Sequence, residues 1–345
     1  MFVTGHSGFT GSWLTLKLVE LGAKVQGYSI GLPTEPSLFN RAEIGKICDS
    51  IWGDVLDREK LLDCVRRFQP DVVIHLAAQP LVRVAYLEPV STILTNAIGT
   101  LNLLEAARKL DGLECALNVT TDKVYRNLES GQPFLESDML GGHEPYSASK
   151  ACSEIISDAY RECYLKGIVI SARAGNIIGG GDWSLDRLVP DSVRAALANE
   201  PIRIRSPLSV RPWQHVADVV TGYLDYVRYK VSGFTAETCL NFGPDLDGCW
   251  TVEKVVSEFC NEWGEGASYV VASDANQTSS ESKLLYLDAS RAKRQLSWRP
   301  RLSPQQALKA CVGWYKAEAS GASPAELVQL MKATFELTEN GTKSV

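Results

Sequence analysis

A tyrosine and a lysine four residues apart, Tyr146 and Lys150, form the pair best suited to proton transfer in this chain. If the run from Ser149 through Tyr160 is a helix, both side chains leave it on one face as neighbours. A phenol with an ordinary pKa of about 10 is a poor base at neutral pH, and a nearby ammonium lowers that pKa by favouring the phenolate. The pair suits proton transfer to or from a hydroxyl group. The spacing alone more often means a half-buried tyrosine beside a solvated lysine.

A second run of reactive side chains, Thr120-Thr121-Asp122-Lys123, lies shortly before that pair. On its own, Asp122-Lys123 fits an exposed turn with an ion pair worth about 0 to 1 kcal/mol. However, a predicted strand precedes the run and the Tyr146 helix follows it. This context favours a shared site over an exposed turn.

The glycine-rich stretch Gly5–Gly11 precedes a helix predicted over residues 12–21, which Gly22 would end. Glycines at such a place let the backbone turn tightly and approach a pyrophosphate, which the free N–H groups and the positive end of the helix then hold. A glycine pattern alone also fits a tight surface turn. The strand predicted over 23–28 favours the binding loop.

Strands and helices alternate along the first half of the chain, which indicates parallel strands joined by crossover helices. Further strands are predicted over 50–55, 71–78, 114–119 and 168–173, and helices over 57–68 and 89–110. Ligands of such sheets gather beyond the carboxyl ends of the strands. We therefore expect Gly5–Gly11, Asp54, Ala77-Ala78 and Thr121–Lys123 to converge on one crevice.

The character of the chain changes after Asn176, where a glycine-rich run, Ile177–Trp183, is followed by spaced arginines. These arginines are Arg187, Arg203, Arg205 and Arg211. Scattered arginines are usually solvated, but after a cofactor-type half they suggest a second anionic ligand, because the guanidinium fork suits phosphate. A smaller α/β region is predicted from here on, with helices over 251–263 and 303–317 and a polar, frayed tail over 336–345.

The composition narrows the class of protein. With 345 residues, 45% of them hydrophobic, the chain could form one large or two moderate domains. A net charge of -6 without any basic run argues against nucleic acid as a partner. No apolar run approaches the roughly 20 residues that span a bilayer, and no signal peptide pattern opens the chain. The nine cysteines show no metal-binding spacing, so we expect no metal and a soluble, cytoplasmic protein with reduced thiols.

Taken together, these segments resemble the extended short-chain dehydrogenase/reductase family and, within it, the nucleotide-sugar 4,6-dehydratases. The shared motifs are Thr4-Gly5-x-x-Gly8-x-x-Gly11, Gly53-Asp54-Val55, His75-Leu76-Ala77-Ala78, Asn96, Tyr146-x-x-x-Lys150, Arg173-Ala174-x-Asn176 and Arg211-Pro212-Trp213-Gln214-His215-Val216. They follow one another along nearly the whole chain, and the ordered set is far more specific than any single motif.

The resemblance implies an α/β fold, a Rossmann-type doubly wound parallel sheet with a smaller C-terminal α/β substrate domain. It implies an NAD-binding domain over residues 1–175 with a returning segment near 211–245. The nucleotide-sugar-binding region would then comprise 176–210 and 246–335. A homodimer joined through the helices near 89–110 and 147–165 is also implied.

Finer features resemble the CDP-glucose branch of these dehydratases. The dTDP-glucose enzymes carry Thr-Asp-Glu after the catalytic strand, whereas this chain has Thr121-Asp122-Lys123. The other stretches that favour this branch are Gly5–Phe9, Pro33–Phe39, Gln79–Arg83, Gly179–Trp183 and Arg211–His215.

The implied reaction is the NAD-dependent dehydration of CDP-D-glucose to CDP-4-dehydro-6-deoxy-D-glucose, in deoxysugar biosynthesis such as that of lipopolysaccharide O-antigen. It combines oxidation at C4, elimination of water across C5–C6 and return of the hydride to C6. The resemblance makes Tyr146 the base at the C4 hydroxyl, Lys150 its partner and a ligand of the nicotinamide ribose, and Thr121 a hydrogen-bond partner of the 4-oxygen. Asp122 becomes the acid, and Lys123 stands where relatives hold a glutamate base. A lysine serves there only when it is neutral.

The remaining site residues are also carried over from the resemblance. For the cofactor they are Gly5, Gly8, Phe9, Thr10, Gly11, Asp54, Val55, Leu76, Ala77, Ala78 and Asn96, together with Tyr146 and Lys150. For the nucleotide sugar they are Gln79, Arg83, Asn176, Arg187, Arg205, Arg211 and Tyr286. Tyr286 and Trp213 could stack on the base, although simple packing is the more frequent role for such residues.

Two features depart from the family pattern. Only Phe2 and Val3 stand beside Met1 before the first turn, so either the first strand is unusually short or the natural start lies upstream. The second strand ends without an acid for a ribose 2'-hydroxyl, and no arginine for a 2'-phosphate appears before Arg41. NAD is therefore implied by the resemblance rather than by these residues.

Other functions remain open at this point. Tyr146 and Lys150 indicate only that the sugar is oxidised at C4, a step that several enzymes of this scaffold share. A 4-epimerase or another nucleotide-sugar 4,6-dehydratase is therefore the nearest alternative. Lys123 in place of glutamate is the feature that separates these enzymes. A non-catalytic NAD-binding sensor is a further alternative that the fold alone does not exclude.

Overall fold

The computed structural model describes residues 1–235, 237–271 and 285–339. Within these residues, seven strands form one parallel sheet in the order β11-β6-β5-β4-β1-β2-β3. The strands are β1 (Phe2–Thr4), β2 (Gln26–Ser29), β3 (Asp49–Trp52), β4 (Val72–His75), β5 (Cys115–Val119), β6 (Val169–Ala174) and β11 (Cys239–Phe242). The order reverses between β1 and β4, which makes the sheet doubly wound. The predicted fold class is confirmed.

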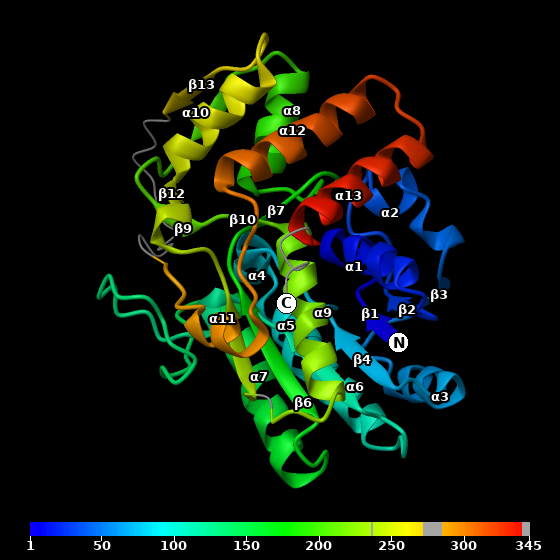
Figure 1. Cartoon of the computed structure of the whole chain (residues 1–345). Coiled ribbons are helices and arrows are strands. Elements are labelled where there is room, and N and C mark those ends of the chain that lie inside the picture. Colours follow the sequence, from blue (N-terminus) through cyan, green and yellow to red (C-terminus); the bar gives the residue numbers. More distant parts are fainter. Residues whose placement is uncertain (236, 272–284, 340–345) are drawn as a thin grey trace.

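Helices cover both faces of this sheet (Figure 1). One face carries α3 (Arg58–Phe68), α4 (Val82–Leu87), α5 (Pro89–Ile93), the π-helical turn η2 (Leu94–Ile98), α6 (Gly99–Ala107) and α7 (Pro145–Cys163). The other carries α1 (Phe9–Glu20), α2 (Leu38–Arg41), the short turn η1 (Ile44–Lys46), α9 (Val216–Val231) and α13 (Pro324–Glu339). Side chains alternate between the faces of a strand, so Val3 and Ile74 enter one core while Phe2 and Val73 enter the other.

A smaller α/β part lies beyond the carboxyl ends of the strands (Figure 1). It contains three two-stranded sheets, β7–β10, β8–β13 and β9–β12, within the described residues. Their strands are β7 (Ile177–Ile178), β8 (Ile202–Ile204), β9 (Val210–Pro212), β10 (Gln214–His215), β12 (Cys249–Thr251) and β13 (Tyr269–Val271). The helices are α8 (Leu188–Leu197), η4 (Leu246–Gly248), α10 (Val252–Trp263) and α12 (Pro304–Ala319), whereas α11 (Ser290–Leu296) packs against β11 of the main sheet and against α9. The predicted division into domains stays a prediction, although β11 of the main sheet does come from the segment expected to return.

The helix that carries Tyr146 and Lys150 begins earlier than 149 because of its cap. The Glu144 carboxylate accepts hydrogen bonds from the backbone N–H groups of Tyr146 (2.6 Å) and Ser147 (2.8 Å), and Pro145 occupies the first turn. Such a cap satisfies N–H groups that a helix start leaves without partners. It places Tyr146 in the first turn of α7, directly beyond the end of β5.

Several sequence predictions need correction. The single helix expected over 89–110 is three segments, α5, η2 and α6, with a π-helical turn in the middle. The prediction of a polar, frayed tail from residue 336 was wrong for residues 336–339, because α13 continues through Glu339 and Thr338 is buried. The rest of the predicted tail, residues 340–345, lies outside the described residues. The helices α4, α8, α9, α11 and α13 were not predicted.

In the part of the chain that the structure describes, no helix combines the length and the apolar character needed to cross a bilayer.

Candidate active site

The glycine loop between β1 and α1 lies against the residues that follow β4. Gly5 has φ +76°, and a Cβ there would lie 2.7 Å from the backbone nitrogen of Ala77. A Cβ on Gly11 would lie only 2.1 Å from the Gly5 carbonyl oxygen. Gly8 caps α1 without a side-chain hydrogen bond, so the N-terminal end of α1 presents backbone N–H groups. This end, with Phe9 and Thr10 in its first turn, suits a pyrophosphate.

The other predicted cofactor residues line the same edge of the sheet. The Asp54 carboxylate accepts a hydrogen bond from the Leu56 N–H (2.9 Å) and so fixes the turn after β3. Val55 is buried, and its backbone carbonyl oxygen accepts a hydrogen bond from the side-chain amide of Asn102 (3.0 Å). Leu76, Ala77 and Ala78 follow β4, directly opposite the glycine loop, and are half-buried.

The side chains of Ser29, His6 and Ser50 form a hydrogen-bonded chain without charge at the end of β2, where the sequence has no acidic residue. Ser29 Oγ lies 2.8 Å from His6 Nδ1, and the other ring nitrogen of His6 lies 3.0 Å from Ser50 Oγ. The backbone N–H of Ser7 donates to Ser29 (3.3 Å), and burial lowers the pKa of His6 to about 4. Arg41 pairs with Glu318 (3.0 Å). Sequence reasoning missed His6 and Ser29, whose only signal is their position in the glycine loop and at the strand end.

Thr121, Asp122 and Tyr146 form one buried cluster at the end of β5. Thr121 Oγ1 donates to Asp122 Oδ1 (2.9 Å), and Thr121 lies close enough to the Tyr146 hydroxyl to lower the pKa of that phenol by hydrogen bonding. The second carboxylate oxygen of Asp122 is buried and has no hydrogen-bond partner among the residues that the structure describes. Burial raises the pKa of Asp122, against the opposing charge of Lys123. A buried carboxyl of this kind favours its protonated form and can act as an acid.

Lys150 lies on the same helix as Tyr146 and donates from Nζ to the Val119 carbonyl oxygen at the end of β5 (3.0 Å). Burial lowers the pKa of Lys150 to about 8, and the charge of Glu154 opposes this change. The expected lowering of the Tyr146 pKa by Lys150 was wrong for this state of the protein. Burial raises the pKa of Tyr146 to about 12, and the main effects in the other direction come from the hydrogen bond with Thr121 and the charge of Arg187.

A buried ion pair that the sequence analysis missed supports this cluster from behind. Glu154, one helical turn beyond Lys150, binds Arg173 of β6 through two hydrogen bonds of 2.8 and 2.6 Å. Thr120 donates to the same carboxylate at 2.5 Å. A buried bidentate pair holds its two elements in a fixed geometry. The signal was available, because Glu154 follows Lys150 at the spacing that places both on one helix face.

Gln79 and Asn96 have structural roles here. Gln79 donates to the Leu81 carbonyl (3.1 Å) and to Thr92 Oγ1 (2.9 Å), and its side-chain oxygen accepts from the Leu81 N–H (2.6 Å). Both of its donor hydrogens are therefore used within this turn, which counts against the predicted substrate contact. Asn96 binds both backbone groups of Gln79 and donates to Ser149 Oγ (2.8 Å). The two side chains tie the loop after β4 to α7.

Two of the four predicted substrate arginines act on the catalytic cluster, and the other two meet at one carboxylate. Arg187 is close enough to Tyr146 to lower its pKa, and the buried Arg211 of β9 does the same to Asp122. Arg83 and Arg205 both contact the Asp186 carboxylate, at 2.7 and 3.7 Å.

The positions of Asn176 and Tyr286, the last two predicted substrate residues, support a role in substrate binding less strongly. Asn176 follows β6 and is half-buried, and its backbone carbonyl accepts from Gln214 (3.2 Å). Tyr286 is half-buried in a segment whose backbone bonds to Phe134 (2.9 Å). Across the described ranges, no hydrogen bond or ion pair joins the Tyr286 side chain to the catalytic cluster.

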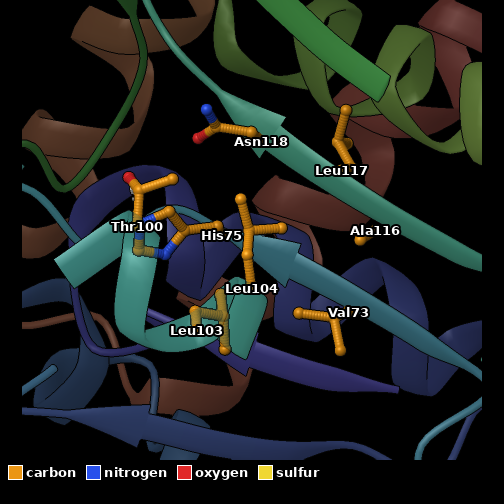
Figure 2. A pocket seen from close by; sticks show the side chains of 8 residues that line it. All are labelled: Val73, His75, Thr100, Leu103, Leu104, Ala116, Leu117 and Asn118. Carbon is orange, nitrogen blue, oxygen red and sulfur yellow. Dashed lines mark hydrogen bonds between the residues drawn. The ribbon is translucent and has the colours of Figure 1, made fainter. Parts of the chain in front are cut away.

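A small internal cavity of about 10 Å³ beneath the crevice is not the substrate site (Figure 2). His75 of β4 lines it with Thr100 of α6, and the His75 ring bonds to Thr4 (2.7 Å) and Thr100 (3.1 Å). Burial lowers the pKa of His75 to about 3. A cavity of this size holds at most about one water molecule. The histidine of the His75–Ala78 motif therefore acts as a neutral link between β1, β4 and α6.

Comparison with known proteins identifies the family. The sequence model of the GDP-mannose 4,6 dehydratase family matches residues 2–311. The chain belongs to this family. The CDP-glucose 4,6-dehydratase of Salmonella typhimurium is 40% identical over 348 residues, which cover 97% of this chain and 96% of the relative. A dTDP-glucose 4,6-dehydratase of Xanthomonas campestris is 28% identical over 91% of this chain and 92% of that protein.

Solved structures of similar proteins share the fold of this GDP-mannose 4,6 dehydratase family member. The dTDP-glucose 4,6-dehydratase of Bacillus anthracis, in complex with NAD, superposes with a TM-score of 0.77 at 24% identity, over 94% of this chain and 98% of that one. The UDP-glucose 4-epimerase of Thermus thermophilus, also in complex with NAD, gives a TM-score of 0.80 at 25% identity, over 91% and 98%. Dehydratases and epimerases thus share this scaffold.

Proposed function

We propose that this protein is a hydro-lyase that converts CDP-D-glucose to CDP-4-dehydro-6-deoxy-D-glucose with NAD as a resident cofactor. The buried cluster of Thr121, Asp122 and Tyr146 carries the proposal, because it places a candidate base and a candidate acid side by side. The full-length similarity to a CDP-glucose 4,6-dehydratase supports the nucleotide and the sugar. An acid beside the tyrosine suits a reaction that expels a hydroxyl after oxidation.

We assign each proton transfer of the reaction to one residue of the chain. Tyr146 acts as the phenolate. Because burial raises the pKa of this phenol to about 12, it first releases its own proton to solvent and then takes the proton of the C4 hydroxyl, while Thr121 holds the 4-oxygen by a hydrogen bond. The resulting ketone acidifies C5–H, and we assign the removal of that proton to Lys123, which stands where relatives hold a glutamate base. Asp122 gives its proton to the departing C6 hydroxyl. When bound in the glycine loop, NAD would supply the hydride chemistry, with the hydride taken from C4 delivered to C6. The proton held by Lys123 then returns to C5, and the proton taken by Tyr146 replaces the one that Asp122 gave, so the net change is loss of water and no external reductant is consumed.

The binding residues position the two ligands for these steps. The α1 end and the glycine loop hold the pyrophosphate of NAD, and the two N–H groups of Lys150 that do not bond to Val119 can reach a ribose hydroxyl. Arg83, Arg187, Arg205 and Arg211 hold the substrate diphosphate. Asn176 contacts the sugar or the phosphates.

The experiment is product analysis by mass after incubation of the purified protein and NAD with CDP-, dTDP-, UDP- and GDP-hexoses in separate reactions. We expect CDP-glucose to lose one water without net formation of NADH. Conversion without a change of mass would instead assign a 4-epimerase. A mass loss seen only with another nucleotide would keep the reaction and replace the substrate.

Substitution of Gly11 by alanine is expected to weaken NAD binding by about tenfold to a hundredfold, because an added Cβ meets the Gly5 carbonyl oxygen at 2.1 Å. Isothermal titration with NAD measures the change. Gly112→Ala is the control, since a Cβ there meets no atom within 4 Å. Unchanged affinity in Gly11→Ala would show that the glycine loop does not hold the cofactor.

We also propose that two copies of the chain form a homodimer through α5, η2 and α7. These neighbouring helices expose large apolar side chains, with Val90 at 70%, Ile93 at 42% and Ile155 at 57% of their area. A strip of this kind on packed helices suits a symmetric contact with a second copy.

A cytoplasmic location fits the nine free cysteines, and a role in deoxysugar biosynthesis follows from the proposed product.

Introduction of a charge into that strip, as Ile155→Glu, is expected to weaken the dimer by at least about a hundredfold, because the carboxylate would be buried without a partner. Sedimentation equilibrium measures the association. Leu246→Glu, at a side chain that is 62% exposed in η4, is the control. A wild-type protein that sediments as a monomer at all concentrations would contradict the proposal.

A further inference from the structure

The candidate diphosphate arginines already meet carboxylates of one short loop. Arg83 of α4 contacts Asp186 (2.7 Å), and Arg205, which follows β8, contacts the same Oδ1 atom (3.7 Å). Arg187 lies 3.6 Å from Asp182 in that loop. Arg83 and Arg205 come from distant parts of the sequence, so the loop is the point where they converge.

The loop lies next to the proposed chemistry. Arg187 directly follows Asp186, and its charge acts on the phenol of Tyr146. A hexose that presents C4 to Tyr146 carries its diphosphate on C1, across the sugar ring. Arg187 thus links the loop to the catalytic cluster, and the proposed function places the diphosphate at the arginines that meet Asp186.

The base of the loop is fixed, whereas its tip can exchange partners. The Asp182 carboxylate accepts from the Ser184 N–H (3.0 Å), and its backbone carbonyl accepts from Tyr315 (2.5 Å). Asp186 has a left-handed backbone (φ 58°), and its side chain is 37% exposed. Ion pairs of such exposure are weak, so a stronger anion can displace this carboxylate.

We propose that Asp186 is an internal competitor that occupies the diphosphate position between Arg83 and Arg205 until the substrate displaces it. This inference rests on the proposed function. A carboxylate brings one negative charge to the two guanidinium groups, whereas a diphosphate brings at least two charges and several acceptor oxygens. A nucleoside without phosphates leaves the Asp186 contacts in place. Asp186 thus weakens the binding of nucleoside diphosphates and not that of nucleosides, and it re-forms its ion pairs when the product leaves.

The test compares wild type and Asp186→Asn, both loaded with NAD, by titration calorimetry with cytidine, CMP and CDP. Asparagine keeps the size of the side chain and removes the competing charge. We expect CDP to bind about threefold to tenfold more tightly to Asp186→Asn, CMP to gain less and cytidine to be unchanged. The gain should shrink at high salt, which screens exposed charges. Asp63→Asn is the matched control, because it removes an exposed aspartate that pairs with Arg67 (2.9 Å) on α3.

A second variant separates competition from a general loosening of the loop. Arg83→Gln is expected to weaken CDP binding, and Asp186→Asn should yield a smaller gain in that background than in wild type, because the two residues act through one contact. Equal or weaker CDP binding by Asp186→Asn, or an equal gain with cytidine, would overturn the inference and leave the proposed function standing. If wild type binds none of CDP, dTDP and UDP, the proposed function fails as well.

Discussion

Tyr146→Phe is expected to lose about a thousandfold in turnover, within the range of 10²–10⁴ that a positioned general base contributes. Phenylalanine keeps the ring in its buried place on α7 and removes only the hydroxyl that bonds to Thr121. NAD binding should therefore change little. The measurement is the initial rate of product formation, together with the NAD dissociation constant from calorimetry.

Tyr164→Phe is the control for the tyrosine substitution, since Tyr164 caps the same helix and is 57% exposed. It should retain full turnover. A Tyr146→Phe variant with ordinary turnover, or one that fails because it no longer binds NAD, would remove the assigned role of the phenol.

Asp122→Asn is expected to separate oxidation from elimination. The amide keeps the shape of the side chain but has no acidic proton for the departing C6 hydroxyl, so elimination should slow by about 10²–10⁴-fold. Oxidation at C4 depends on Tyr146 and should continue. NADH absorbance is therefore expected to rise during turnover of this variant, whereas the wild type shows no net rise.

Rapid mixing with CDP-glucose, followed by absorbance and by mass analysis of the quenched sugar, measures both steps in the Asp122→Asn variant. Asp111→Asn, on an exposed loop after α6, should behave as wild type. Loss of both steps together would assign Asp122 to the oxidation, and normal elimination would transfer the acid role to another group.

The charges around Lys150 explain how a buried lysine near the Tyr146 phenol can still carry a proton at neutral pH. Burial lowers its pKa to about 8, and Glu154 acts against that change. Glu154 itself is held by Arg173 and Thr120. As the pH rises above about 8, the ammonium loses a proton, which would leave Lys150 one N–H group instead of two for the proposed contact with a ribose hydroxyl.

Part of this site could be predicted because it depends on local spacing and on strand ends. The separation of Tyr146 and Lys150 fixes their common helix face. The parallel register pairs Thr4 with His75 and His75 with Asn118, so the residues after β1, β4 and β5 had to share one edge of the sheet. The glycine loop precedes a helix, and the close approach of Gly5 to Ala77 shows why glycine stands there.

The rest depends on contacts between distant segments, which a single sequence does not record. Nothing near Gln79 in the sequence indicates that Thr92 and Leu81 use both of its donors. The effect of Lys150 on Tyr146 was overestimated because the cost of burying a phenolate depends on the complete environment. The meeting of Arg83 and Arg205 at Asp186 needed the fold.

The central claim is that hydride leaves C4 and returns to C6 of the same sugar while water is lost. CDP-glucose carrying deuterium at C4, incubated with the protein and unlabelled NAD, tests it directly when the product is analysed by mass and NMR. We predict a 4-keto product that has lost one water and carries deuterium at C6. A product with deuterium absent from C6, or one that keeps the mass of the substrate, would contradict the account.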